Sequence, residues 1–135
     1  MADLTITAAN VVRGSGAKVL DRTAGVAITA GQTVYEAADG GMQLADCDSA
    51  TAAARVPEGI ALNDAAANQP VQVLKSGDIT IGATLTPGTA YYQSANAGGI
   101  APVADLATGD YPCIVGIAKS ASLLSVKIHA SGVAL

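Results

Sequence analysis

Phenylalanine and tryptophan are both absent from this chain of 135 residues, and only four tyrosines supply aromatic surface. Apolar residues still make up 50% of the sequence, but that fraction is inflated by alanine, which buries little area. Any core must therefore be built from Val, Ile, Leu and Tyr side chains. The sequence predicts one domain with a thin core and modest stability, part of which comes from a partner that binds only the folded form.

Basic residues are also few, since seven Lys and Arg against eleven Asp and Glu give a net charge of −4. The seven are scattered along the sequence, whereas nucleic-acid-binding surfaces carry clustered basic charge. No stretch is long and apolar enough to cross a membrane as a helix. The chain also begins without the basic and then apolar segment of a signal peptide. We expect a protein that is made in a cytoplasm and binds neither nucleic acid nor membrane.

Residues suited to catalysis are equally sparse. His129 is the only histidine, and strand alternation places it on the polar face opposite Val126 and Ile128. No Gly-x-Ser-x-Gly sequence flanks a serine, and residues 13–18 (RGSGAK) lack the spacing of a phosphate-binding loop. We expect no enzyme activity and no cofactor. A small hydrolase acting through His129 is the alternative that a His129→Ala variant would test.

The two cysteines, Cys47 and Cys113, are too far apart in sequence for a zinc motif. We expect free thiols that pack as small apolar groups, with a disulfide as the alternative in an oxidising compartment. Neither lies beside a basic residue that would lower its pKa. The acidic loop residues do not follow the spacing of a calcium-binding loop, so we expect them to be solvated and to hold no metal. These residues are Asp39, Asp46, Asp48 and Asp64.

Alternation of apolar and polar residues predicts strands, for example over residues 79–81 and 124–130. Glycine-rich turns recur at short intervals between such segments. Many short strands separated by turns indicate an all-β protein, a compact sandwich or barrel. The only candidate helix is Ser49–Arg55, which is too short to be stable alone, and an irregular loop fits these residues equally well.

A repeat with an offset of 57 residues is the most informative pattern in the chain. Residues 28–35 (ITAGQTVY) align with residues 85–92 (LTPGTAYY), and the Gly-Ile-Ala of 59–61 returns at 116–118. A repeated unit of this size is a supersecondary block that cannot bury its apolar face alone. We therefore expect two sequence-related halves that pack on each other around one core.

The repeat divides the chain into a lead-in and one β domain. Residues 1–24, the lead-in, are expected to form an extended N-terminal arm or edge strands. Residues 25–135 form the domain, which consists of the repeats 25–77 and 78–135.

Later positions in the two repeats align if the second copy is two residues shorter, which places residues 71–73 on 126–128. Each repeat would then close on a Ser-Gly pair. Tyr35, Tyr91 and Tyr92 follow a glycine turn, where we expect their rings to cover the rim of a barrel and their hydroxyls to stay in water.

Six short segments, three in each repeat, carry a resemblance to a known family. They are 30–35 (AGQTVY), 59–62 (GIAL) and 69–73 (QPVQV) in the first repeat, and 87–92 (PGTAYY), 97–102 (AGGIAP) and 116–118 (GIA) in the second. Together they resemble the decoration proteins, also called cement proteins, of tailed-bacteriophage capsids. The resemblance covers roughly residues 25–135.

The resemblance implies a structural virion protein that binds the outer surface of an icosahedral capsid, bridges neighbouring capsomers and stabilises the shell. The implied partner is the major capsid protein, and the implied oligomer is a homotrimer. The family offers no catalytic residues to carry over. The alternative is another phage structural or adhesion module, such as a head fibre base, a tail component or a glycan-binding module.

The lead-in is the candidate for a capsid-facing arm, because an extended apolar segment can add a strand to an exposed sheet edge of a partner. Equally open is that it pairs within its own domain as an edge strand. The candidate contact residues are Leu4, Ile6, Val11 and Val12.

Overall fold

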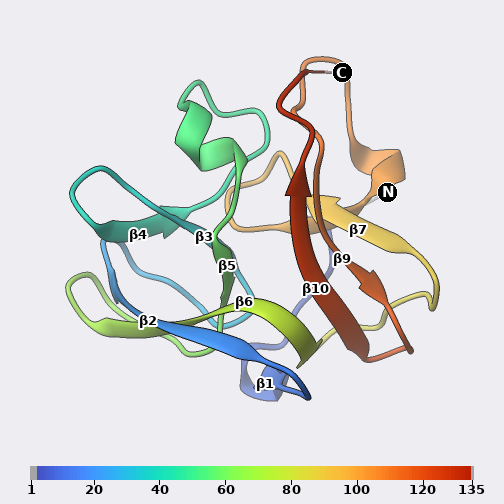
Figure 1. Ribbon diagram of the computed structural model, residues 1–135, viewed down its shortest axis with the longest axis horizontal. Helices are drawn as coiled ribbons and strands as arrows, with labels where there is room; N and C mark the ends of the chain where they lie inside the picture. Colours follow the sequence, from blue (N-terminus) through green and yellow to red (C-terminus); the bar gives the residue numbers. More distant parts are fainter. Residues whose placement is uncertain (1–2, 135) are drawn as a thin grey trace.

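The computed structural model describes residues 3–134 as a nearly all-β fold, which confirms the expected fold class (Figure 1). One sheet contains the strands in the order β2-β4-β3-β5-β6-β10-β9-β7-β8, and β1 pairs with β6 beside it. The strands are β1 (Val12–Arg13), β2 (Lys18–Ala24), β3 (Thr33–Glu36), β4 (Gly41–Leu44), β5 (Gly59–Ala61), β6 (Pro70–Thr80), β7 (Ala90–Gln93), β8 (Ile100–Pro102), β9 (Cys113–Ala118) and β10 (Leu123–Ala130).

Three short 3₁₀-helices are the only helical segments among residues 3–134: η1 (Ala8–Asn10), η2 (Ala52–Arg55) and η3 (Val103–Asp105). The candidate helix Ser49–Arg55 is therefore helical only over η2. A single turn does not hold itself in water. Packing stabilises it instead, since Ala54 is buried and the Arg55 Nε donates a hydrogen bond to the Ser49 carbonyl (2.8 Å).

Five strands of the first half close into a small barrel, because β2 pairs with both β4 and β6. Alternation along β6 points Val71 and Val73 into this barrel and leaves Pro70 and Gln72 exposed. Small and branched side chains fill the interior: Ala24, Ile28, Val34, Met42, Ala61, Ala65, Val71 and Val73.

A second and larger apolar cluster joins the two repeats. Ile60 and Leu74 of the first repeat and Ile100 and Leu124 of the second all belong to it, and none of them has exposed surface. Val11 of the lead-in is buried in the same cluster. Because residues of both repeats share this cluster, each repeat buries apolar surface against the other.

The repeats build their first strand pairs in the same register. Between β3 and β5, Thr33 lies opposite Ile60, and between β7 and β9, Ala90 lies opposite Ile117. These partners differ by the 57 residues of the sequence offset. The repeated sequence is thus also a repeated pairing of strands.

Gly59 and Gly116 occupy equivalent positions in these two strand pairs, and at both the neighbouring strand leaves no room for a side chain. A Cβ on Gly59 would collide with the carbonyl oxygen of Leu74, and a Cβ on Gly116 would collide with that of Ser125. The glycine of each Gly-Ile-Ala segment therefore has the same steric cause, which is close approach of another backbone.

The closing strands differ from the expected alignment. Leu74 of β6 lies opposite Ile60, whereas Ser125 of β10 lies opposite Ile117. Eight residues connect β5 to β6, but only four connect β9 to β10. The second repeat is therefore shorter here by more than the two residues that the sequence alignment assumed. The placement of residues 71–73 on 126–128 is therefore wrong, and the two Ser-Gly pairs are not equivalent.

The lead-in follows the surface of the second half and closes it. The Leu4 N–H donates to the carbonyl of Ile100 on β8 (2.8 Å), and the Thr7 N–H donates to the carbonyl of Gly82 just after β6 (2.8 Å). β1 then pairs with β6. Residues 4–13 of the lead-in thus bridge β8 and β6 in the second half, whereas its last residues form β2, which bridges β4 and β6 in the first half.

Candidate functional site

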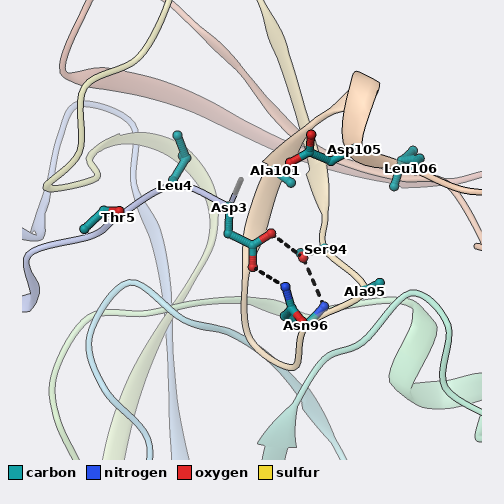
Figure 2. Close-up of a pocket in the computed structure, with 9 residues that line it drawn as sticks. All are labelled: Asp3, Leu4, Thr5, Ser94, Ala95, Asn96, Ala101, Asp105 and Leu106. Carbon is teal, nitrogen blue, oxygen red and sulfur yellow. Dashed lines mark hydrogen bonds between the residues drawn. The ribbon is translucent and has the colours of Figure 1, made fainter. Parts of the chain in front are cut away.

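A hollow of about 450 Å³ lies where the lead-in meets the turn between β7 and β8 (Figure 2). The Asp3 carboxylate accepts hydrogen bonds there from the Ser94 hydroxyl (2.6 Å) and the Asn96 side-chain amide (3.1 Å). The Asn96 backbone N–H also donates to the Ser94 hydroxyl (3.0 Å), so the three residues form one network. These polar groups hold the start of the lead-in on its own domain.

The four candidate contact residues of the lead-in have different surroundings. Val11 is buried, and Leu4 and Ile6 are half-buried against the larger apolar cluster. Val12, by contrast, is 57% exposed on β1. Three of the four are therefore packed within the chain's own fold, and Val12 is the candidate that faces solvent.

Val12 stands at the rim of a shallow groove of about 670 Å³ between the lead-in and the end of β6. None of the described residues that line this groove is charged. β1 pairs only with β6 among the described strands, so its other edge is open. An open edge beside an uncharged groove suits a partner strand or loop that docks through backbone hydrogen bonds. Hydroxyl groups dominate the lining, from Thr5, Thr7, Thr80, Thr84 and Ser122.

His129 lies exposed on β10, as expected, but the pairing of β10 with β9 is irregular between Val126 and His129, so simple alternation does not relate the faces of these two residues. Within residues 3–134, no hydroxyl or carboxylate is hydrogen-bonded to its ring. No three His, Cys, Asp or Glu side chains of this described part gather closely enough to hold a metal ion. His129 therefore has no described neighbour that would activate it as a base.

Cys47 and Cys113 are free and buried. Burial, reinforced by the negative charge of Asp110, raises the pKa of the Cys47 thiol to about 12. Burial also raises the pKa of the Cys113 thiol to about 11. Both side chains are therefore neutral at neutral pH and pack as small apolar groups.

Asp39, Asp48 and Asp64 are exposed, as the sequence predicted, whereas Asp46 is half-buried, which corrects the expectation for that residue. Asp39, Asp46 and Asp64 each accept a hydrogen bond from a backbone N–H at 2.8 to 3.2 Å. Burial, together with a hydrogen bond and negative charge from Asp48 and the charge of Asp110, raises the pKa of Asp46 to about 6. Asp39, Asp46 and Asp64 therefore stabilise loops.

All four tyrosines are buried or half-buried. Tyr91 is 4% exposed, and its hydroxyl accepts a hydrogen bond from the Thr86 N–H (3.0 Å), so the expectation of a solvated hydroxyl is wrong there. The Arg55 guanidinium lies 3.8 Å from the centre of the Tyr111 ring. None of these rings is a fully exposed platform on which a sugar could stack.

The basic residues are scattered in the sequence but not in the fold. Lys18, Lys75 and Lys127 line one hollow together with Pro57 and Ile128. No motif in the sequence joins these positions, which come from β2, β6 and β10. Only the pairing of these strands brings the lysines together, so the sequence alone carried no signal for this site.

No protein-family model matches this chain, and no curated protein matches it either. The resemblance to phage decoration proteins accordingly rests on the six short segments. Among residues 3–134, no helix combines the length and apolar character needed to traverse a bilayer.

Proposed function

We propose that this protein is a structural component of a phage virion that binds the outer surface of an icosahedral capsid. It bridges neighbouring capsomers, contacts the major capsid protein and stabilises the shell as a homotrimer. One observation carries the proposal: four of the six segments that resemble decoration proteins build the repeated strand pairs. They overlap β3 and β7 and supply the Gly-Ile-Ala pairing partners in β5 and β9, in one register.

A body with two related modules suits a bridging role, because each module presents its own loops to a neighbouring subunit. Many copies on one shell act together, since each bound contact raises the effective concentration for the next. An interface of about 800 Å² per partner is the standard size for specific binding, and its affinity depends on packing rather than area. A net charge of −4 suits the outside of a shell, away from packaged nucleic acid.

The groove beside Val12 is the candidate contact with the shell. Its uncharged, hydroxyl-rich lining and the open edge of β1 suit a strand or loop of the capsid protein. A Val12→Asp substitution places a charge at this rim without touching the buried core. Val133, which is 67% exposed near the other end of the chain, offers the matched control Val133→Asp.

The test is co-sedimentation with empty shells of the major capsid protein from the same virus, followed by electron microscopy of the decorated particles. We expect saturable binding and many copies spread over the outer surface. Val12→Asp should weaken binding about tenfold, equivalent to about 1.4 kcal/mol, while Val133→Asp leaves it unchanged. Shells that take up no wild-type protein would refute the proposal. In whole virions, density of this protein confined to the tail or to single vertices would support the fibre or tail alternative.

A further inference from the structure

Three of the seven basic residues converge on one hollow of about 340 Å³, here called the lysine hollow. Its lysines are Lys18 at the start of β2, Lys75 in β6 and Lys127 in β10, and all three are exposed. Lys18 and Lys127 both lie opposite Ser76 of β6, one on each side of it. The sheet therefore places Lys18 and Lys127 on the two sides of the same residue of β6.

A β-bulge in β6 adds the third lysine. Lys18 lies opposite Ser76 and the next residue, Val19, lies opposite Leu74, so Lys75 is the extra residue of the longer strand. A bulge interrupts the alternation of side chains and re-aims one of them. In a regular strand, Lys75 and Ser76 would point to opposite faces of the sheet. Here Lys75 and Ser76 line the same hollow.

The lysines of the hollow also lack the carboxylate partners that other basic residues have. Arg22 and Lys119 each form an ion pair at 2.9 Å. Among the described residues, no carboxylate lies within 4.0 Å of the ammonium group of Lys18, Lys75 or Lys127. Like charges gathered in this way repel one another. A partner that brings negative charge relieves this repulsion.

The lining of the hollow adds a second chemical feature. Glu58 also lines the hollow, but its carboxylate pairs with Arg22 (2.9 Å) and forms no ion pair with any of the three lysines. Pro57 and Ile128 supply apolar surface beside the three ammonium groups. A short acidic side chain, with an aliphatic stem and a charged end, matches this combination of surfaces.

We propose that the lysine hollow docks a cluster of Asp or Glu carboxylates on the outer surface of the capsid protein, an inference that rests on the function proposed above. Ammonium groups are compact point charges on flexible stems and adjust to carboxylates at several positions. Attraction between complementary charges also steers the approach of the partner and fixes its orientation. The hollow and the groove beside Val12 would then hold one subunit by two different chemistries.

Nucleic acid is a poorer match for the same hollow. A DNA duplex carries one negative charge per about 1.7 Å and needs an extended basic track. The basic surface here is confined to three lysines, and the chain as a whole carries a net charge of −4. The rest of the surface therefore repels a long polyanion while the hollow accepts a compact group of carboxylates.

The first test titrates the protein with hexaglutamate and follows backbone amide signals by nuclear magnetic resonance. We expect shifts centred on Lys18, Lys75, Ser76 and Lys127, and their loss in a triple Lys→Gln variant of the three lysines. Lys119→Gln, which removes a lysine already paired with Asp78, should leave the shifts intact. Shifts spread over the whole surface, or equal shifts in the triple variant, would overturn the inference. Larger shifts with a DNA duplex of equal charge would overturn it in favour of nucleic acid.

The second test measures binding of the same variants to empty shells at rising salt. The triple variant should bind about tenfold more weakly and with a flatter salt dependence, while Lys119→Gln behaves like the wild type. Equal binding and salt dependence in the triple variant would refute the lysine hollow and leave the proposed function standing. No binding by the wild type would refute the proposed function, and with it the shell as the occupant. All three lysines are exposed, so thermal unfolding of the triple variant should match the wild type.

Discussion

Thr33 and Gln93, which lie 60 residues apart in the sequence and are both fully buried, are hydrogen-bonded to each other across the two repeats. The Thr33 hydroxyl donates to the Gln93 side-chain oxygen, and the Gln93 side-chain amide donates to the carbonyl of Ala45 (2.8 Å). The bond joins β3 to β7, the corresponding strands of the two repeats. A buried polar pair with satisfied partners specifies how two apolar surfaces dock, because any other arrangement leaves these groups unpaired.

Removing one member of this pair should destabilise the fold more than removing both. Thr33→Val leaves the Gln93 oxygen without its donor, and Gln93→Leu leaves the Thr33 hydroxyl without its acceptor. Each change should cost about 1–3 kcal/mol in the free energy of unfolding, measured in urea. The double variant should lose less than the sum of the two, because neither partner is then left unpaired. Strictly additive losses would contradict the link.

The equivalent glycines of the two repeats should be equally intolerant of substitution. Gly59→Ala and Gly116→Ala each force a Cβ against a backbone carbonyl, so we expect a loss of roughly 1–3 kcal/mol or more in thermal or urea unfolding. Gly109→Ala is the control, because its Cβ would meet no atom within 4 Å and only its φ of +98° is unfavourable. A well-tolerated alanine at either of the first two positions would be inconsistent with the shared register.

Asp46 should make the stability of the fold fall as pH rises. Its pKa is raised to about 6 in the folded state, above the ordinary value of 3.8, so the folded chain holds this proton more tightly than the unfolded chain does. The free energy of unfolding therefore falls as the pH rises from about 4 to about 6, and it stays lower at higher pH. Asp46→Asn keeps an acceptor for the Asp48 N–H and removes the charge. The variant should exceed the wild type in urea unfolding at about pH 8 and lose this advantage near pH 4. If the stability advantage of Asp46→Asn over the wild type grew as the pH fell, the raised pKa of Asp46 would be contradicted.

The two thiols should resist labelling until the protein unfolds. Both cysteines have no exposed surface, and their raised pKa values keep them protonated at about pH 8. A chromogenic disulfide reagent should therefore react with neither in the native protein and with both in urea. Rapid native labelling at Cys47 or Cys113 would show that its surroundings open in solution.

The parts of the fold that follow from local sequence were predictable. Alternation along Leu124–Ala130 and glycine-rich turns indicated strands, and the Gly-Ile-Ala repeat indicated a repeated strand pair. The closing strand was misaligned because Val71-Gln72-Val73 and Val126-Lys127-Ile128 share the same pattern of a β-branched, a polar and a β-branched residue. The register of the closing strand depends on the length of the loop that precedes it. Composition does not encode where that loop ends, and only the pairing of Ile60 with Leu74 fixes the register.

The sites were less predictable than the fold because they depend on non-local pairing. Lys18, Lys75 and Lys127 come together only through the order of three strands and one bulge. The apolar lead-in offered a candidate list, but sequence could not separate the exposed Val12 from the buried Val11. Val11 caps the end of η1 and is buried, whereas Val12 begins β1 and is exposed, and no local signal in two adjacent valines separates these surroundings.

The lead-in is translated before the residues with which it pairs. Asp3 must wait for Ser94, which is 91 residues further along, and Leu4 must wait for Ile100. Until then the apolar side chains of Leu4 and Ile6 have no complete surface of their own to cover, and such long-range closure is slow. The start of the lead-in can therefore take its place on its own body only after the second half of the chain has been synthesised.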